Sequence, residues 1–434
     1  MTSSRPDTHD PAELGAPGRA DARTDAGTGP DDPAVAFDPF EPGFVASPYG
    51  QYARLRAHDP VHWSPLLDGW VLTRHDDVVA VLRDPTVSVE LDNARPTGVV
   101  DLQRERQSRS GRPSNTVVLL DDPDHNRLRK LLQQPFGPRP VDALRAMVTD
   151  RVDAAIAELA PRGEMDVVAD FAYPLPVAIF NDMLGLPDED APRVREWIQA
   201  VARMLDPVLD DDEYARCQAL MDEMYDYLDG QVEAKRRAPA DDVLTALVQA
   251  EEDGDRLSRD ELVAQVVTLY VAGHEPTMSL VGTGMLALLR QPDQLALLRA
   301  RPDLLPNAIN ELLRYDGPNQ FVRRIATQPM AIGGREVAPG DVLYPCVGAA
   351  NRDPQRWEEP DLVRVDRSDA AHHVQFGSGV HHCLGAHLAR LQAEVALGAL
   401  VLRLDDVALA GEPAWSERMV IRGLQSLPIT YRPA

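Results

Sequence analysis

The chain has 434 residues and a formal charge of −25, so it can bury a large core, while its acidity argues against nucleic acid or an anionic membrane as a broad-surface partner. Its three cysteines, Cys217, Cys346 and Cys383, are too few and too scattered for a disulfide framework. We therefore expect a reducing, cytoplasmic location.

The first 36 residues are rich in Asp, Pro, Gly, Ala and Thr, with almost nothing apolar to bury. We expect residues 1–36 to form a disordered tail, with no signal peptide and no membrane anchor. No comparable linker follows, so residues 37–434 are predicted to form one domain. Short β-like runs at 61–63 and 69–73 predict small sheets in a chain whose pattern is otherwise mostly helical.

The next part of the chain is polar and then helical. Residues 92–114 are rich in arginine, and we expect a solvated loop there. A helix is predicted from Asp122 because Asp and Pro favour a helix start, and it places His125 and Arg129 four apart on one face. Residues 206–211 are interpreted as a mobile connection. The helical segments predicted around it are 141–159, 171–184, 193–205, 212–236 and 240–250.

The longest apolar helical run, residues 262–289, is interrupted by the hexapeptide that begins at Ala272 and reads AGHEPT. A carboxylate inside an apolar helix is costly unless it is satisfied or functional, which makes Glu275 a candidate functional acid. Pro276 has no N–H and its ring crowds the Ala272 carbonyl, so we expect the helix to open or bend there. The Thr277 hydroxyl projects about 100° further round the helix.

The most informative stretch, residues 372–404, has Cys383 at its centre with glycines at 377, 379 and 385. Glycines let the backbone pass close to a flat, bulky group. From Leu384 the apolar residues recur with helical spacing, so Cys383 lies at a loop-to-helix junction that favours a thiolate. Such a thiolate suits a haem iron as axial ligand. Structural zinc sites need paired cysteines or tight Cys/His pairs, which do not occur here.

The frame Phe376-x-x-Gly379-x-x-x-Cys383-x-Gly385 resembles the haem-binding loop of the cytochrome P450 family. The resemblance runs from about residue 37 to the C-terminus. It implies a mainly α fold with small β-sheets, a single haem domain of the soluble bacterial type, haem b as cofactor and Cys383 as the iron ligand. It also implies haem-propionate contacts from His125, Arg129, Arg324 and His381, and further haem contacts from Ala272, Phe376, Gly379 and Gly385.

A second matching motif is the pair Glu311-x-x-Arg314, which resembles the family's Glu-x-x-Arg pair and is expected to brace the fold under the haem loop. The family commonly completes this network with an arginine where this chain has Leu362. Arg364 or Arg367 is left to take the role, or no residue takes it.

The resemblance implies a haem-thiolate monooxygenase that oxidises a small organic substrate, in our interpretation a secondary metabolite, with O₂. The electrons would come from a separate ferredoxin or similar donor, whose acidic face we expect at the basic patch of Arg127 and Lys130, and the enzyme is expected to be a monomer. Glu275 would gate protons, with Thr277 or water as relay.

Pro276 departs from the family's pattern, which usually has a hydroxyl residue at this position. Oxidative cross-linking without oxygen insertion is therefore an open alternative. A non-catalytic haem sensor is a remote one, because a mere carrier has no need of a buried acid such as Glu275. The sequence identifies neither the substrate nor, within the monooxygenase reading, hydroxylation as opposed to epoxidation.

Overall fold

The structure is a computed structural model that describes residues 35–112, 115–206, 209–252 and 255–433. Residues 36–434 form one compact unit. The tail predicted at residues 1–36 lies outside the described residues, apart from its last two positions.

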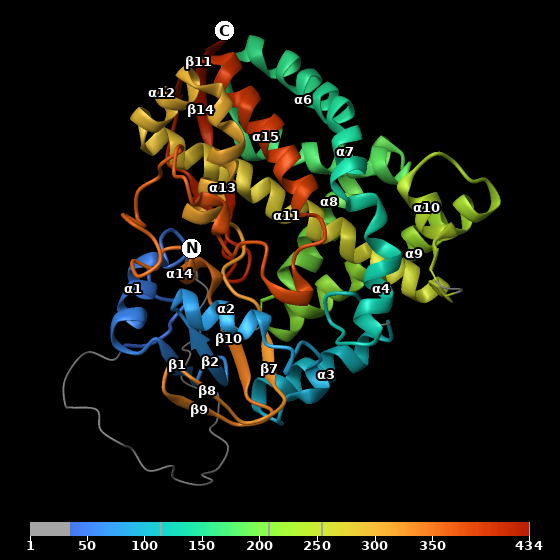
Figure 1. The fold of residues 1–434 in the computed structure, drawn as a ribbon. Coiled ribbons are helices and arrows are strands. Elements are labelled where there is room, and N and C mark those ends of the chain that lie inside the picture. The colour runs from blue at the N-terminus through green and yellow to red at the C-terminus, as the bar shows by residue number, and fades with distance from the viewer. Residues whose placement is uncertain (1–34, 113–114, 207–208, 253–254, 434) are drawn as a thin grey trace, which may run out of the picture. The chain divides into compact units, whose positions relative to one another are not determined.

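Helices dominate the described chain (Figure 1). The helices up to the long central one are α1 (Tyr49–His58), α2 (His75–Arg83), α3 (Gly98–Ser110), α4 (Asp124–Leu132), α5 (Pro138–Ala143), α6 (Arg145–Leu159), α7 (Pro174–Leu184), α8 (Ala191–Arg203), α9 (Asp211–Arg237) and α10 (Val243–Gln249). The central helix and those after it are α11 (Arg259–Arg290), α12 (Pro292–Ala300), α13 (Leu305–Asp316), α14 (Val347–Ala350) and α15 (Ala386–Arg403).

The largest sheet has the strand order β1-β2-β10-β7-β3, with β10 parallel to β2 and the other pairs antiparallel. Its strands are β1 (Val61–Ser64), β2 (Gly69–Leu72), β10 (Val342–Pro345), β7 (Arg324–Ala326) and β3 (Val87–Ser88). A second sheet joins β11 (Leu404–Leu409), β14 (Pro428–Pro433) and β4 (Glu164–Asp166). The remaining strands pair as β12 (Ala414–Trp415) with β13 (Leu424–Ser426), β5 (Glu251–Glu252) with β6 (Asp255–Arg256), and β8 (Met330–Ile332) with β9 (Arg335–Val337). The sheet with β1, β2, β10 and β7 lies to one side of most of the helices, whereas β11 and β14 lie beside α12 and α15 (Figure 1).

Helix α11 organises the core. A capping box starts it, in which the Ser258 hydroxyl accepts from the Glu261 N–H while the Glu261 carboxylate accepts from the Ser258 N–H. Its apolar side chains pack with those of α6, α7 and α15 in one large hydrophobic cluster. The helix continues through Pro276 to Arg290, so the opening expected at the proline does not occur. Burial among neighbouring helices holds this segment helical although one backbone hydrogen bond is lost.

Two predictions of secondary structure were wrong. The segment 92–114, expected as a solvated loop, contains α3, which the Thr97 hydroxyl caps by accepting from the Val100 N–H. Gly111 ends α3 in the left-handed conformation that suits glycine. The single helix predicted over 141–159 is divided into α5 and α6.

One described stretch, residues 167–184, is long and apolar enough to cross a membrane. Since 72% of it is buried inside the protein, we assign it to the core.

Candidate haem site

The loop before α15 places Cys383 just before the N-terminus of this helix. Gly377 and Gly379 have φ values of +72° and +74°, a conformation that L side chains rarely adopt. A Cβ at Gly379 would also lie 2.5 Å from the Leu82 carbonyl oxygen. The Cys383 N–H donates to the Phe376 carbonyl at 2.8 Å, which closes the loop. These constraints fix the direction of the Cys383 backbone immediately before α15.

Space is left beside the cysteine. Gly385 has an ordinary φ of −86°, and a Cβ there would meet nothing within 4 Å. Backbone strain therefore does not require glycine at this position, although the notch beside it leaves room for another group. The Phe376 ring is half-buried, and the Arg390 guanidinium lies 4.5 Å from its centre.

Cys383 is the exposed cysteine, whereas Cys217 and Cys346 are buried. Burial raises the pKa of the Cys346 thiol to about 12, which leaves that thiol inert. Neighbouring protein atoms also raise the pKa of Cys383, but the Gly385 N–H and the charges of Arg129 and Arg390 lower it. A metal ion at this sulfur would hold it as thiolate.

A stripe of incompletely covered residues runs along α11. Between Leu262 and Leu288 every residue of α11 is buried except Thr268, Leu269, Ala272, Gly273 and Pro276. Three of them lie four positions apart and so share one helix face, and Ala272 among them is exposed. An exposed residue in the middle of a core helix marks a space for a group that the protein itself does not supply.

The four basic side chains predicted as propionate contacts, two arginines and two histidines, come together. The His125 and His381 rings lie 4.3 Å apart. Burial, followed by the charges of Arg324, His125 and Arg129, lowers the pKa of His381 to about 3. Burial likewise lowers the pKa of Arg324 to about 10, although the charge of Asp121 opposes it. The structure thus gathers these residues from α4, β7 and the cysteine loop.

This cluster has too little negative charge. His125 Nε2 is buried with no hydrogen-bond partner among the described residues, and its Nδ1 lies 3.4 Å from Asp122. Arg129 donates to the His382 carbonyl at 2.8 Å and Arg324 to the Arg323 carbonyl at 2.8 Å. Neither guanidinium has a carboxylate partner in the described part of the chain. Buried Arg324 and half-buried Arg129 lack a negative partner, and the buried His125 Nε2 lacks a hydrogen-bond partner. A ligand with carboxylates at its edge fits these groups.

Comparison with known proteins agrees with this arrangement. Residues 78–409 match the family model of cytochrome P450. The chain belongs to the cytochrome P450 family.

The P450 relatives cover nearly the whole chain. The cytochrome P450 monooxygenase PikC of Streptomyces venezuelae is 37% identical, over 94% of this chain and 97% of its own. The vitamin D(3) 25-hydroxylase of Pseudonocardia autotrophica is also 37% identical, over 91% of this chain and 96% of its own. The structure of CxnD, a P450 for C–S bond formation in chuangxinmycin biosynthesis, superposes with a TM-score of 0.81 at 32% identity, covering 90% of this chain and 96% of that one.

The mainly α fold with small sheets, the family and the P450 oxidoreductase activity are therefore confirmed, and haem b is the cofactor. Because these relatives are enzymes, the alternative of a non-catalytic haem sensor is rejected. The space beside Gly385, the stripe at Ala272 and the cations without counter-ions are the features that fit this cofactor.

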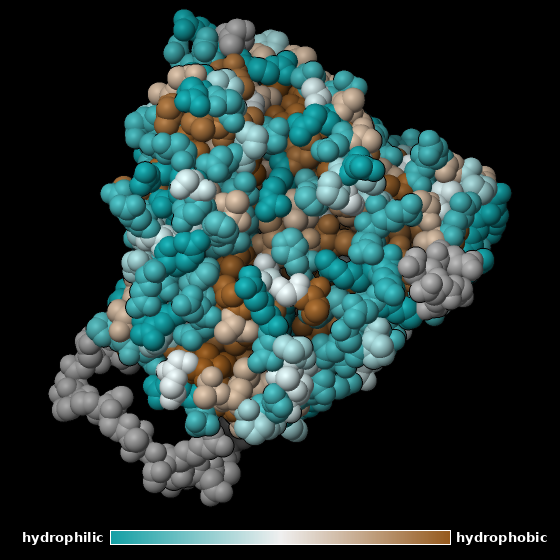
Figure 2. Space-filling model, viewed as in Figure 1, coloured by the Kyte–Doolittle hydropathy of each residue, from teal (hydrophilic) through white to brown (hydrophobic). Residues whose placement is uncertain are grey.

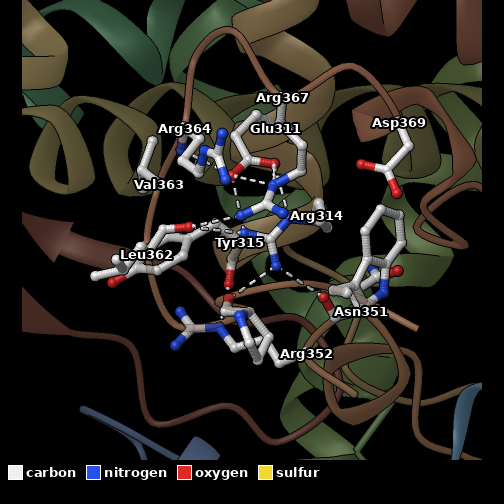
Figure 3. A network of polar contacts seen from close by, with 12 residues as sticks. Glu311, Arg314, Tyr315, Asn351, Arg352, Leu362, Val363, Arg364, Arg367 and Asp369 are labelled. Atoms are coloured by element: carbon white, nitrogen blue, oxygen red, sulfur yellow. Dashed lines mark hydrogen bonds and ion pairs between the residues drawn. The ribbon is translucent and has the colours of Figure 1, made fainter. Parts of the chain in front are cut away.

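The network expected around Glu311 and Arg314 is complete, as Figure 3 shows. Arg314 donates from Nε and Nη2 to both carboxylate oxygens of Glu311 at 2.7 and 2.9 Å, and both side chains are fully buried. Arg367 donates from Nε to Glu311 at 3.0 Å, so it takes the place of the arginine missing at Leu362. Arg364 contributes only its backbone N–H to Glu311, and its side chain pairs with Glu359.

Glu275 is fully buried in the P450 fold, and its partner was not predicted from the sequence. Arg418, from the turn between β12 and β13, donates to one of its carboxylate oxygens, Oε2, at 2.7 Å. The other oxygen, Oε1, is buried with no hydrogen-bond partner among the described residues. The two residues lie 143 positions apart, and no local pattern in the sequence predicts their contact.

Thr277 is buried, and its hydroxyl donates to the Gly273 carbonyl at 2.9 Å. Pro276 has no N–H, so the Ala272 carbonyl lacks the donor that a regular helix supplies. This segment therefore holds an engaged hydroxyl at Thr277 and a carbonyl without its helical donor at Ala272.

The arginines of 92–114 are engaged by the protein itself. Arg104 donates to three backbone carbonyls, and Arg109 pairs with Glu105. Buried Arg106 pairs with Asp211. Half-buried Arg112 pairs with Asp222 and Asp226, and all three aspartates lie on α9. Arg106 and Arg112 thus tie α3 and the residues after it to α9.

Proposed function

We propose that this P450 is a monooxygenase for a small organic substrate, of the secondary-metabolite class, with electrons supplied by a separate ferredoxin or a similar protein. The observation that carries this assignment is the exposed Cys383 in its glycine frame, next to two histidines and to two arginines that have no carboxylate partner among the described residues. Monomeric state and cytoplasmic location stay predictions.

Within this proposal Cys383 holds the iron through its thiolate, and His125, Arg129, Arg324 and His381 hold the propionates by charge-assisted hydrogen bonds. Phe376, Gly379, Gly385 and Ala272 shape the space around the ring. Haem b, once bound, supplies the iron at which O₂ is reduced and substrate oxidised.

Proton delivery is assigned to α11. Glu275 takes a proton on Oε1, the carboxylate oxygen with no partner, and passes it toward the face of α11 that carries Ala272. Thr277 can relay only if its hydroxyl hydrogen leaves the Gly273 carbonyl. Ordered water at the Ala272 carbonyl is the second relay.

Electrons are proposed to enter next to Cys383. A cavity of about 370 Å³ lies there, with Arg129, Phe136, His382 and His387 among its lining residues. Figure 2 shows patches of hydrophobic residues near the middle of the face in view, surrounded by hydrophilic residues. Lys130 is exposed on α4, whereas Arg127 is paired with Glu261 and contributes less to a basic patch than expected.

A second function, bond formation without oxygen insertion, is favoured by one observation. Pro276 removes the usual hydroxyl position, and the Thr277 hydroxyl is already bonded. The name of the structural neighbour CxnD, at 32% identity, describes C–S bond formation.

The experiment has two stages. Candidate substrates are first titrated against the ferric enzyme, where a compound that enters the pocket shifts the haem Soret band. Turnover of the binders under ¹⁸O₂ is then analysed by mass spectrometry. A monooxygenase product carries one ¹⁸O atom, whereas an unlabelled product two hydrogens lighter than substrate establishes the second function.

A further inference from the structure

The tip of the hairpin between β12 and β13 reaches the buried acid of α11. Arg418 is the residue that makes this contact, and 15% of its side chain is exposed, against none for Glu275. It engages a single oxygen of Glu275. By contrast, both oxygens of buried Glu311 accept hydrogen bonds from arginines. A purely structural buried pair is expected to resemble that of Glu311, because an unsatisfied buried oxygen costs stability.

Other contacts fix where Arg418 can lie. Asp206, at the C-terminal side of α8, accepts from the backbone N–H groups of Met419 and Val420 at 3.2 and 3.0 Å. Arg422 anchors the base of the turn, donating to Asp316 at 2.6 Å. The Arg418 backbone is thus held between two buried carboxylates, and its guanidinium has a defined approach to Glu275.

A cavity of about 810 Å³ with mixed polar and apolar walls adjoins this ion pair. Glu275 and Arg418 line it together with Tyr173 and Arg195, and its other walls come from α8, α9, α11, the hairpin and Val168. The Arg195 guanidinium lies 4.1 Å from the Tyr173 ring centre, and burial followed by the charge of Glu275 raises the pKa of Tyr173. Glu275 therefore forms part of the cavity wall.

Glu275 also lies close to the face of α11 that carries Ala272. At 100° per residue, its side chain lies about 60° round α11 from Ala272, the exposed residue of the stripe. A carboxylate between this cavity and the reaction side can carry protons from one to the other only if its orientation is controlled.

We propose that Arg418 is a positioning residue that holds Oε2 of Glu275 on the cavity side and leaves Oε1 free to accept a proton and pass it to the reaction side. The inference rests on the proposed role of Glu275 in proton delivery. Asp206 acts one step further away, by placing the backbone that carries Arg418.

The variants R418M, E275Q and their double mutant test this, with R432M as control because Arg432 pairs with Asp406 at the exposed surface. R418M should slow turnover by about tenfold or more, as expected for a lost proton-transfer geometry. The substrate dissociation constant from the Soret titration should change by less than about twofold, since Arg418 acts on proton delivery and not on binding. The double mutant should be no slower than E275Q, because both residues serve one step.

Added guanidinium ion gives a second readout, the melting temperature, which does not depend on activity. Guanidinium should bind next to Glu275 in R418M, raise the melting temperature of this variant and restore part of its turnover. Ammonium should have neither effect. Guanidinium should have no such effect on the parent, on R432M or on the double mutant. If R418M does not retain haem, R418K takes its place: it should keep the melting temperature of the parent yet slow turnover, because one ammonium group does not reproduce the guanidinium geometry.

The outcomes separate the two levels of the proposal. E275Q with the turnover of the parent contradicts the proton role of Glu275, and this inference falls with it. A slow E275Q beside an R418M, or its replacement R418K, that turns over like the parent overturns the role of Arg418 alone. So does a double mutant much slower than E275Q, or an R418M that guanidinium fails to stabilise.

Discussion

Cys383 differs from the other two cysteines in what surrounds its sulfur. Burial keeps Cys346 protonated, since it raises the pKa of that thiol to about 12. Neighbouring protein atoms raise the pKa of Cys383 as well, but this cysteine is exposed, and the Gly385 N–H, Arg129 and Arg390 oppose the rise. At the residue scale, the same amino acid is thus a packing residue in one place and a candidate metal ligand in another.

Arg367 makes a residue-scale prediction with a matched control three positions away. R367M should lower the free energy of unfolding by about 3–5 kcal/mol, because it leaves part of the fully buried Glu311 charge uncompensated. R364M should change it by less than about 0.5 kcal/mol, since the Arg364 side chain is 40% exposed and makes only a 3.6 Å pair. Urea unfolding followed by circular dichroism measures both. Equal losses in the two variants would contradict the assignment of Arg367 to the brace.

At the scale of elements, α11 combines a structural and a chemical task. Its apolar residues organise the core, and its incompletely covered stripe at Thr268, Ala272 and Pro276 faces a space that the protein does not fill. The helix continues through Pro276 because packing compensates for one missing backbone hydrogen bond. The chemical consequence is the freed Ala272 carbonyl next to the engaged Thr277 hydroxyl.

Thr277 can be tested as a relay at this scale. If its hydroxyl relays protons, T277A should raise the fraction of consumed electrons that ends as hydrogen peroxide, because protons then reach the wrong oxygen. T277S keeps the hydroxyl and should behave like the parent. Peroxide is measured against product formed per NADPH consumed. Equal leakage from T277A and the parent would assign the relay to water at the Ala272 carbonyl.

The hairpin of β12 and β13 is anchored by a buried ion pair that predicts a pH effect. Burial raises the pKa of Asp316, but the charge and hydrogen bonds of Arg422 outweigh it and hold that pKa below its usual range. The unfolded chain therefore takes up this proton first as the pH falls. The stabilisation is complete above the unfolded pKa of about 3.9 and is lost as the pH falls through the folded value.

D316N should accordingly flatten the acid limb of stability against pH below about pH 4 and lower stability at neutral pH. D406N, which alters an exposed pair with Arg432, serves as control and should leave both unchanged. The measurement is urea unfolding at a series of pH values. An acid limb as steep in D316N as in the parent would show that another carboxylate dominates it.

At the scale of the whole molecule, local motifs were predictable and long-range partners were not. The frame around Cys383 spans ten residues, so its spacing predicted the loop, and the helical recurrence of apolar residues from Leu384 predicted the helix after it. The ion pair of Glu275 and Arg418 joins residues 143 positions apart, which no periodicity reveals. Helix α3 was missed because its polar face is satisfied by α9, a contact that exists only in the folded chain.

The assignment of Cys383 as the iron ligand is central to the proposed function, and the ferrous–CO spectrum tests this assignment most directly. The parent should show the Soret band shifted to long wavelength by a thiolate ligand. C383S should lose that band, while C217S and C346S, which alter the buried cysteines, should keep it. Survival of the thiolate-shifted band in C383S would contradict the central claim.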